Sequence, residues 1–118
     1  NIPNVKSNHP EKVDHPCQFP IELVERCVLA LTEENSWVLD PFAGVGSTVI
    51  GAIKNKRNAI GIEKEDAYCK IARQRINELK EGMLKVRPIN KPIHKPSGND
   101  KFSRVPEAWL TLNLTKGH

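Results

Sequence analysis

The amino-acid sequence predicts an α/β fold in which a parallel sheet is flanked by helices. Helical and short apolar segments alternate along the chain in the order helix, strand, helix, strand, helix. A glycine-rich turn follows the first strand, and the helix between the two strands supplies the crossover that parallel pairing needs. With 118 residues, the chain has room for one small domain. Ligands of such folds bind at the carboxyl ends of the strands, so the candidate site lies there.

The first two elements are a helix at residues 20–32 and a strand at residues 36–40. Pro20 suits the first position of a helix because its fixed φ and missing N–H cost little there. The apolar residues of this helix recur at the spacing of one face: Val24, Cys27, Val28 and Leu31. The strand SWVLD is short and apolar, so we expect it to be buried within the sheet.

The remaining elements follow the glycine turn. A second helix is expected through about residue 55, with Ser47 or Thr48 as its cap. Residues 57–63, RNAIGIE, predict a second buried strand. A third helix is expected over about residues 65–81, with Gly82 as its stop. The inner face of this helix is predicted to carry Tyr68, Ile71, Ala72, Ile76 and Leu79.

The glycine turn lies in the stretch VLDPFAGVGST, and its neighbours restrict the ligand. Gly44 and Gly46 allow a tight turn, and the helix behind them offers free N–H groups to an anion. A dinucleotide fingerprint needs a third glycine where Val49 stands, and a phosphate-binding loop needs a lysine where Ser47 stands. Asp40 would also repel a pyrophosphate. Both NAD and ATP are therefore disfavoured.

A ligand with both an ammonium and a carboxylate suits this turn better. Asp40 can pair with the cation, while Ser47, Thr48 and the turn amides bind the anion. The methionine end of S-adenosylmethionine carries these two groups. Glu63 stands at the carboxyl end of the second strand, where a carboxylate can accept hydrogen bonds from two ribose hydroxyls. We therefore expect Asp40 and Glu63 to bracket one cofactor.

Three stretches resemble motifs of S-adenosylmethionine-dependent DNA methyltransferases that modify exocyclic amino groups, the N6-adenine and N4-cytosine enzymes of restriction-modification systems. DPFAGVGST is similar to their cofactor-binding motif, although Val45 and Ser47 stand where a serine and a threonine are common. HPCQFPIELVERCVLALT resembles the H-P-x-x-F-P segment and helix that precede this motif in the β-type arrangement; the matching residues are His15, Pro16, Phe19 and Pro20. AIGIEKEDAYCKIARQRI resembles the next motif, with Glu63 as the ribose-binding acid. Together the motifs cover about residues 9–80.

The resemblance implies a partial Rossmann-like methyltransferase fold that binds S-adenosyl-L-methionine. It implies these cofactor-binding residues: His15, Phe19, Pro20, Asp40, Phe42, Gly44, Gly46, Ser47, Thr48 and Glu63. Phe19 and Phe42 can line an apolar slot for the adenine and methionine portions, with simple core packing as the alternative for each. His15 is expected to shape its loop rather than to do chemistry.

The family's catalytic motif, D/N/S-P-P-Y/F/W, has no counterpart in this chain because no Pro-Pro occurs. In the β-type arrangement that motif lies upstream of the cofactor motifs. The resemblance therefore implies the carboxyl-terminal, cofactor-binding part of a DNA methyltransferase, inactive alone and complemented by an amino-terminal part of the same enzyme. Double-stranded DNA is the expected substrate of the whole enzyme, and a homo-oligomer is possible on sequence grounds. Two alternatives stay open: an RNA or small-molecule methyltransferase module, and a noncatalytic nucleotide-binding domain.

Charge and proline content divide the chain in two. Residues 1–83 form the predicted cofactor-binding part, with a net charge of −1. Residues 84–118 form a predicted basic, proline-rich extension, in which 7 Lys and Arg against 2 Asp and Glu give a net charge of +5. We expect this extension to be extended rather than helical, and either to contact a polyanion or to stay solvated.

The cysteines and the hydropathy exclude several classes of protein. Cys17, Cys27 and Cys69 lack the spacing of a disulfide framework or a zinc cluster, so buried free thiols are expected. His15 lies near Cys17 in sequence but is not expected to bind a metal. No apolar run reaches the length of a membrane span and no leader opens the sequence, so a soluble cytoplasmic protein is expected.

Overall fold

The structure, a computed structural model, describes residues 2–6, 9–15 and 17–92. Its elements are α1 (Ile21–Leu31), β1 (Trp37–Asp40), α2 (Ser47–Lys54), β2 (Asn58–Gly61) and α3 (Asp66–Lys80). Strands β1 and β2 pair in parallel, with Trp37 opposite Asn58 and Asp40 opposite Gly61. The α/β class, the order of the elements and the parallel pairing are thereby confirmed. None of these helices is long and apolar enough to cross a membrane.

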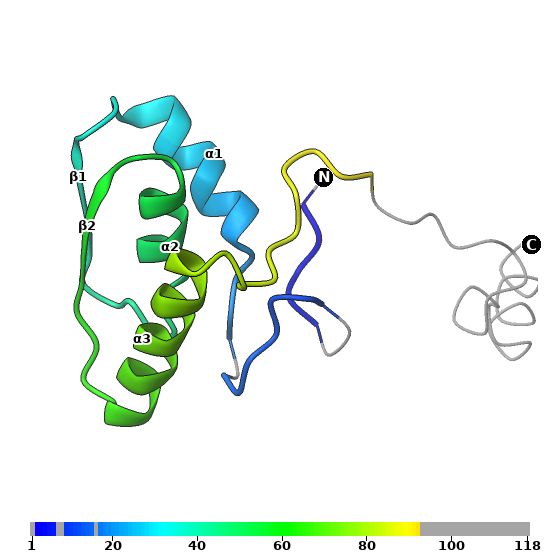
Figure 1. Cartoon of the computed structure of the whole chain (residues 1–118), viewed down its shortest axis with the longest axis vertical. Helices are drawn as coiled ribbons and strands as arrows, with labels where there is room; N and C mark the ends of the chain where they lie inside the picture. The colour runs from blue at the N-terminus through cyan, green and yellow to red at the C-terminus, as the bar shows by residue number, and fades with distance from the viewer. Residues whose placement is uncertain (1, 7–8, 16, 93–118) are drawn as a thin grey trace, which may run out of the picture.

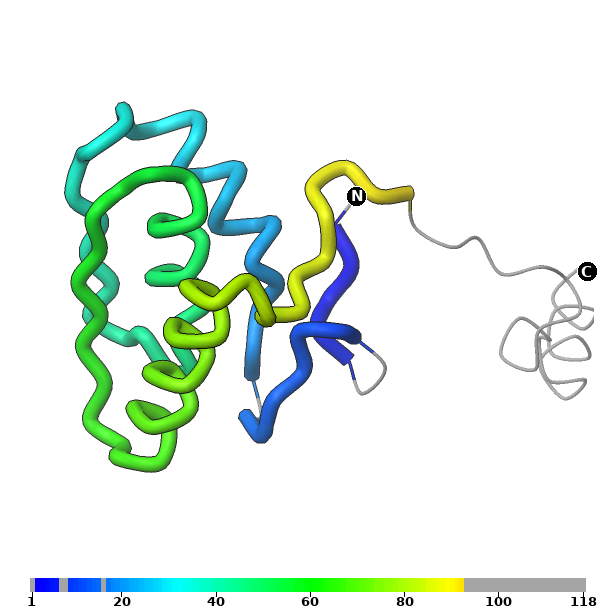
Figure 2. Tube along the Cα trace, viewed as in Figure 1, coloured from blue at the N-terminus to red at the C-terminus, as the bar shows by residue number. Residues whose placement is uncertain are grey.

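The helices gather on one side of the two-stranded sheet (Figures 1 and 2). Val24 and Val28 of α1 and Ala52 of α2 form the buried core cluster between the helices. Val38 and Ala59, which are register partners in the sheet, pack against this cluster from the strands. The core therefore lies on the helical side of the sheet.

The prediction that both strands are buried is wrong. Trp37 is 68% exposed and Leu39 63%, while Ile60 and Ile62 are 50% and 55% exposed. Strand side chains alternate between the two faces of a sheet, so the neighbours of Val38 and Ala59 along each strand point away from the helices. A single strand–helix–strand crossover covers only one face of its sheet. We call these four residues the outer face; in the described residues no element covers it.

The starts of two helices also differ from expectation. Pro20 is the N-cap of α1, in extended backbone with φ −69° and ψ 143°, rather than its first helical residue. Gly46 is the N-cap of α2, with a left-handed φ of 80°, so Ser47 is the first helical residue and neither Ser47 nor Thr48 caps this helix. A glycine was favoured here because the turn enters the helix through positive φ, which a serine or threonine adopts only with strain.

The end of α3 is as predicted. Gly82 adopts a φ of 72°. Its amide donates to the Leu79 carbonyl at 3.1 Å, and the Met83 amide donates to the Glu78 carbonyl at 2.8 Å. This pair of bonds is a Schellman motif, which satisfies carbonyls of the last helical turn.

The expectation of buried thiols is wrong for two of the three cysteines. Cys17 and Cys27 are exposed, and Cys69 is half-buried. Cys27 and Leu31 lie on the predicted inner face of α1, yet they line an open groove instead of a core. Within the described part of the chain, the sheet has no strand beyond β1 that could cover them.

A segment after α3 is held against the start of α1. Residues 84–92 contain no helix, as their prolines predicted. Glu11, only 4% exposed, accepts bonds from the Ile21 amide at 2.9 Å and from the Arg87 amide at 3.0 Å. Glu22 accepts a bond from the Arg87 guanidinium at 2.7 Å, and both of these side chains are buried. We call residues 84–92 the strap.

The division of the chain at residue 83 stays a prediction, and the rest of the predicted extension, 93–118, lies outside the described residues.

Glu22 makes the strap sensitive to pH. Burial raises the pKa of the Glu22 carboxyl, but bonds from Arg26 and the Asn90 amide, together with the charges of Arg26 and Arg87, outweigh burial and hold this pKa below its ordinary value. Because the folded-state pKa is lowered, the ionised carboxylate stabilises the fold above the ordinary glutamate pKa. This contribution is lost as the pH falls through the lower, folded-state value.

We therefore expect Glu22→Gln to lower the midpoint of thermal unfolding at pH 7, because it leaves Arg87 buried without its carboxylate, a loss of about 3 to 5 kcal/mol. The difference in midpoint from the unchanged chain should shrink as the pH falls from the ordinary glutamate pKa through the lower pKa of folded Glu22. Circular dichroism melts between pH 7 and pH 3 measure it. Glu34→Gln is the control, because the Glu34–Lys56 pair is exposed and contributes little. An equal effect of both substitutions would contradict the assignment.

Candidate functional site

The glycine turn, residues 41–46, connects β1 to α2 and is hydrogen-bonded to the chain that leaves β2. The Ile62 amide donates to the Asp40 carbonyl and the Ala43 amide donates to the Ile62 carbonyl, each at 2.9 Å. The chain leaving β2 is therefore bonded to the chain leaving β1 beyond the last strand residues. As a result, side chains that follow β2 reach the turn that follows β1.

Two predicted acids bind amides of this one turn. Asp40 Oδ1 accepts from the Phe42 amide at 2.9 Å. Glu63 Oε2 accepts from the Gly44 amide at 2.9 Å, and its Oε1 accepts from the Glu65 amide at the same distance. The bond from the Glu65 amide is the largest influence on the pKa of Glu63 and lowers it. The amides of Gly44 and Lys64 and the charge of His15 lower it further. Together they outweigh burial and hold this pKa below its ordinary value. The structure thus brings both acids to the turn, with Glu63 ionised at neutral pH.

His15 lies against the glycine turn, although it is far from the turn in sequence. A Cβ placed on Gly44 would lie 3.4 Å from His15 Nε2. The imidazole packs edge-on against Tyr68 of α3, with ring centroids 4.6 Å apart, and its Nδ1 accepts from the Cys17 amide at 3.1 Å. The described part of the H-P-x-x-F-P segment is therefore anchored between the turn and α3.

The start of α2 presents donors beside the turn. The amides of a first helical turn have no partner within the helix. In the described structure no side chain caps α2. Thr48 is half-buried. Ser47 is only 3% exposed, and its hydroxyl lies 3.4 Å from the Arg75 guanidinium. The backbone amides and Thr48 are therefore better placed to meet a ligand than the Ser47 hydroxyl is.

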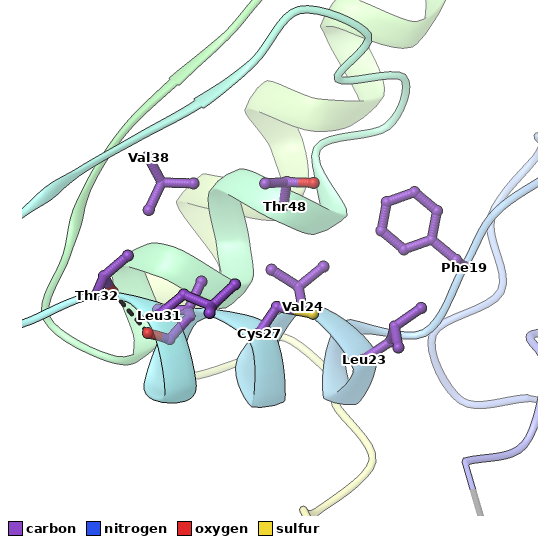
Figure 3. A pocket seen from close by; sticks show the side chains of 9 residues that line it. Phe19, Leu23, Val24, Cys27, Leu31, Thr32, Val38 and Thr48 are labelled. Carbon is purple, nitrogen blue, oxygen red and sulfur yellow. Dashed lines mark hydrogen bonds between the residues drawn. The ribbon is translucent and has the colours of Figure 1, made fainter.

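The two predicted aromatic residues occupy different surroundings. Phe19 is 41% exposed and lines an open groove of about 420 Å³ along α1, which also takes in Thr48 (Figure 3). Phe42 is 86% exposed and is not among the residues that line this groove. Pro20 is buried at the start of α1. We call the open groove beside Phe19 the α1 groove. Its lining is almost entirely apolar and consists of Phe19, Leu23, Val24, Cys27, Val28, Leu31, Thr32, Val38 and Thr48.

One residue at the site was missed by reasoning from the sequence. Arg75 of α3 is 3% exposed, and its Nη1 donates to the Val45 carbonyl at 2.5 Å, from beneath the glycine turn. The signal that could have found it is a charged residue at inner-face spacing, three residues after Ala72. In the described ranges no cluster of His, Cys, Asp or Glu is arranged to hold a metal ion.

Comparison with known sequences identifies relatives of this arrangement. A family profile described as DNA methylase matches residues 1–74. Type II methyltransferase M2.LlaDCHI of Lactococcus lactis subsp. cremoris is 47% identical over 64 residues, which are 54% of this chain and 24% of that protein. Type II methyltransferase M.BglII of Bacillus subtilis is 46% identical over 71 residues, 60% of this chain and 20% of that protein. The chain thus spans about a quarter or less of the length of these two relatives.

Solved structures show the same fold. The M1.HpyAVI–SAM complex superposes with a TM-score of 0.55 and 42% identity, over 57% of this chain and 33% of that one. TTHA0409 of Thermus thermophilus, complexed with S-adenosyl-L-methionine, superposes with a TM-score of 0.50 and 42% identity, over 51% of this chain and 25% of that one. The predicted methyltransferase fold is thereby confirmed. Because the profile covers more than half of the residues, this chain belongs to the DNA methylase family.

Proposed function

We propose that this chain binds S-adenosyl-L-methionine as part of a DNA methyltransferase that modifies the exocyclic amino group of adenine at N6 or of cytosine at N4. The observation that carries the proposal is the glycine turn, where the carboxylates of Asp40 and Glu63 hold two amides beside an uncapped helix. Family membership and two similar solved structures, both complexes with this cofactor, support it.

The groups at the turn fit the charges of this cofactor. The Glu63 carboxylate is ionised, and each of its oxygens retains a second lone pair for a ribose hydroxyl. The free amides at the start of α2 suit the methionine carboxylate, because the helix dipole favours an anion there. Asp40 supplies a negative charge for the ammonium. We propose that Thr48, Phe19 and Phe42 add contacts and that His15, Pro20, Gly44, Gly46 and Ser47 shape the site.

Bound cofactor would supply an electrophilic methyl group, and a base flipped from the duplex would accept it. This chain has no Pro-Pro sequence, so we propose that it contributes binding and orientation of the cofactor rather than the catalytic motif. The catalytic motif would come from an amino-terminal part of the same enzyme. The working environment we propose is the cytoplasm, with double-stranded DNA as substrate and the basic residues after 83 available for phosphate contacts.

The surfaces of the chain support a complementing part. The outer face is apolar and exposed, and β1 has only one strand neighbour in the described structure. Parallel sheets are normally covered on both faces, and exposed strand edges pair with other chains. We propose that the amino-terminal part covers the outer face and the α1 groove; self-association through the same surface is the alternative.

Asp40→Ala and Glu63→Ala should each raise the dissociation constant for S-adenosyl-L-methionine by about tenfold or more. Each removes a charge-assisted bond to the cofactor, whose loss weakens binding by about this factor, and also releases an amide of the turn. Calorimetric titration of the complemented enzyme measures the change. Glu33→Ala, an exposed acid near the opposite ends of the strands, should leave binding unaltered. Unaltered binding in both site variants would remove Asp40 and Glu63 from the cofactor site.

The cofactor should bind weakly to this chain and much more tightly once the amino-terminal part is present. The reason is that the exposed Phe42 and the open α1 groove leave one side of the site without a wall. Equilibrium dialysis with labelled cofactor compares the two states. Equally tight binding in both would show that the chain alone completes the site.

The fluorescence of Trp37 should report the complementing surface. Its side chain is 68% exposed on the outer face, so covering it should shift its emission to shorter wavelength. Trp109→Phe removes the second tryptophan and assigns the signal to Trp37. An emission maximum that stays in place when the amino-terminal part binds, with binding verified by gel filtration, would exclude the outer face as the interface.

A further inference from the structure

Among the described residues, the side-chain hydrogen bonds of Arg75 go only to the glycine turn and the start of α2. Its guanidinium donates through Nη1 to the Val45 carbonyl at 2.5 Å and to the Ser47 hydroxyl at 3.4 Å. Val45 lies between Gly44 and Gly46, whose φ values of 52° and 80° make this the most unusual backbone of the site. The guanidinium therefore binds the carbonyl at the centre of the turn.

The surroundings of Arg75 do not favour a role in stability. None of the four ion pairs in the described residues includes Arg75. Its Nη2 is buried and has no hydrogen-bond partner there. Burial is the largest influence on the pKa of Arg75 and lowers it, against the charges of Glu11 and Glu78. A buried cation without a paired carboxylate costs stability, so its contacts with the turn require another reason.

Arg75 belongs to a stripe of α3 that contacts the site at three levels. Tyr68 packs against His15. Ala72, one turn further, leaves only 3.1 Å between its Cβ and the position of a Cβ on Gly46. Arg75, at the next turn, adds the only hydrogen bonds of the stripe to the turn. Packing by Ala72 restricts how close α3 lies, but a directional bond is needed to fix the orientation of a peptide group.

We propose that Arg75 is a positioning residue for the cofactor turn, on the basis of the proposed function. By holding the Val45 carbonyl, it fixes the peptide plane that leads into Gly46. That plane sets the direction of α2 and of the free amides at Ser47, Thr48 and Val49. Arg75 thereby aims these amides at the carboxylate of the cofactor without touching the cofactor itself.

The test compares three variants of the full chain with the unchanged chain. Arg75→Met removes the donors while keeping an unbranched side chain, and Arg75→Lys keeps one charged donor. Lys70→Met is the matched control, because it removes an exposed charge from the same helix. Three quantities are measured: NMR order parameters of the amides at residues 44–48, the dissociation constant for S-adenosyl-L-methionine by NMR titration, and the midpoint of thermal unfolding.

For Arg75→Met we expect the order parameters of the turn to fall from about 0.85 to below about 0.6. We expect the dissociation constant to rise about tenfold, as loss of a bond to a charged group predicts. The midpoint should hold or rise, because an unpaired buried charge is gone. Arg75→Lys should give intermediate values for the turn and for binding, and Lys70→Met should match the unchanged chain.

Two results would overturn the proposal. One is that the order parameters of the turn and the dissociation constant for S-adenosyl-L-methionine are the same in Arg75→Met as in the unchanged chain. The other is a lowered midpoint with increased mobility throughout α1, α2 and α3, which would make Arg75 a general structural residue. If the unchanged chain fails to bind the cofactor at millimolar concentrations, alone and with its amino-terminal part, the proposed function fails. The order parameters would still decide whether Arg75 fixes the turn.

Discussion

The hydrogen bond from the Gly44 amide to the Glu63 carboxylate is the interaction on which the site depends. It joins the turn after β1 to the segment after β2. In a simple pair of parallel strands, these two parts of the chain would separate beyond the sheet. The backbone bond from Ala43 to Ile62 supports the same junction. Because the carboxylate serves as acceptor for the turn, a single ionised group can order the turn and face a ligand at once. Binding chemistry and local structure are therefore coupled at Glu63.

The covered and the open side of the sheet follow from one topological fact. Two parallel strands joined by one helix place that helix on one face, and α1 and α3 lie on the same side (Figure 1). This side holds the core, while the outer face keeps aromatic and branched side chains in solvent. The strands carry apolar side chains on both faces of the sheet, but the described residues contain helices that cover only one face. The apolar content of β1 and β2 thus exceeds what the one covered face requires.

Much of the fold could be predicted because its determinants are local. Helical periodicity placed α1 and α3, the glycine turn placed the start of α2, and Gly82 ended α3 through its own φ. The acids at the strand ends could be predicted because parallel strands end at one edge, which brings Asp40 and Glu63 to the same turn. The cap of α2 could not be predicted, because serine and glycine are both common as N-caps. Only the backbone conformation that enters the helix decides between Ser47 and Gly46. The inner-face spacing of Arg75 could have shown that it is buried, but not what it binds, because its acceptor is the main-chain carbonyl of Val45.

The strap was also beyond prediction, and it has a consequence for the order of folding. The bonds of Arg87 with Glu11 and Glu22 span 76 and 65 residues. During synthesis, α1, the sheet and α3 are complete before Arg87 is added, so Glu22 begins with only the neighbouring Arg26 as a cationic partner. Closing so long a loop is entropically costly, and contacts of this kind form late. We therefore expect the strap to dock late and to bury the charges at the start of α1 after the turn and its neighbours have assembled.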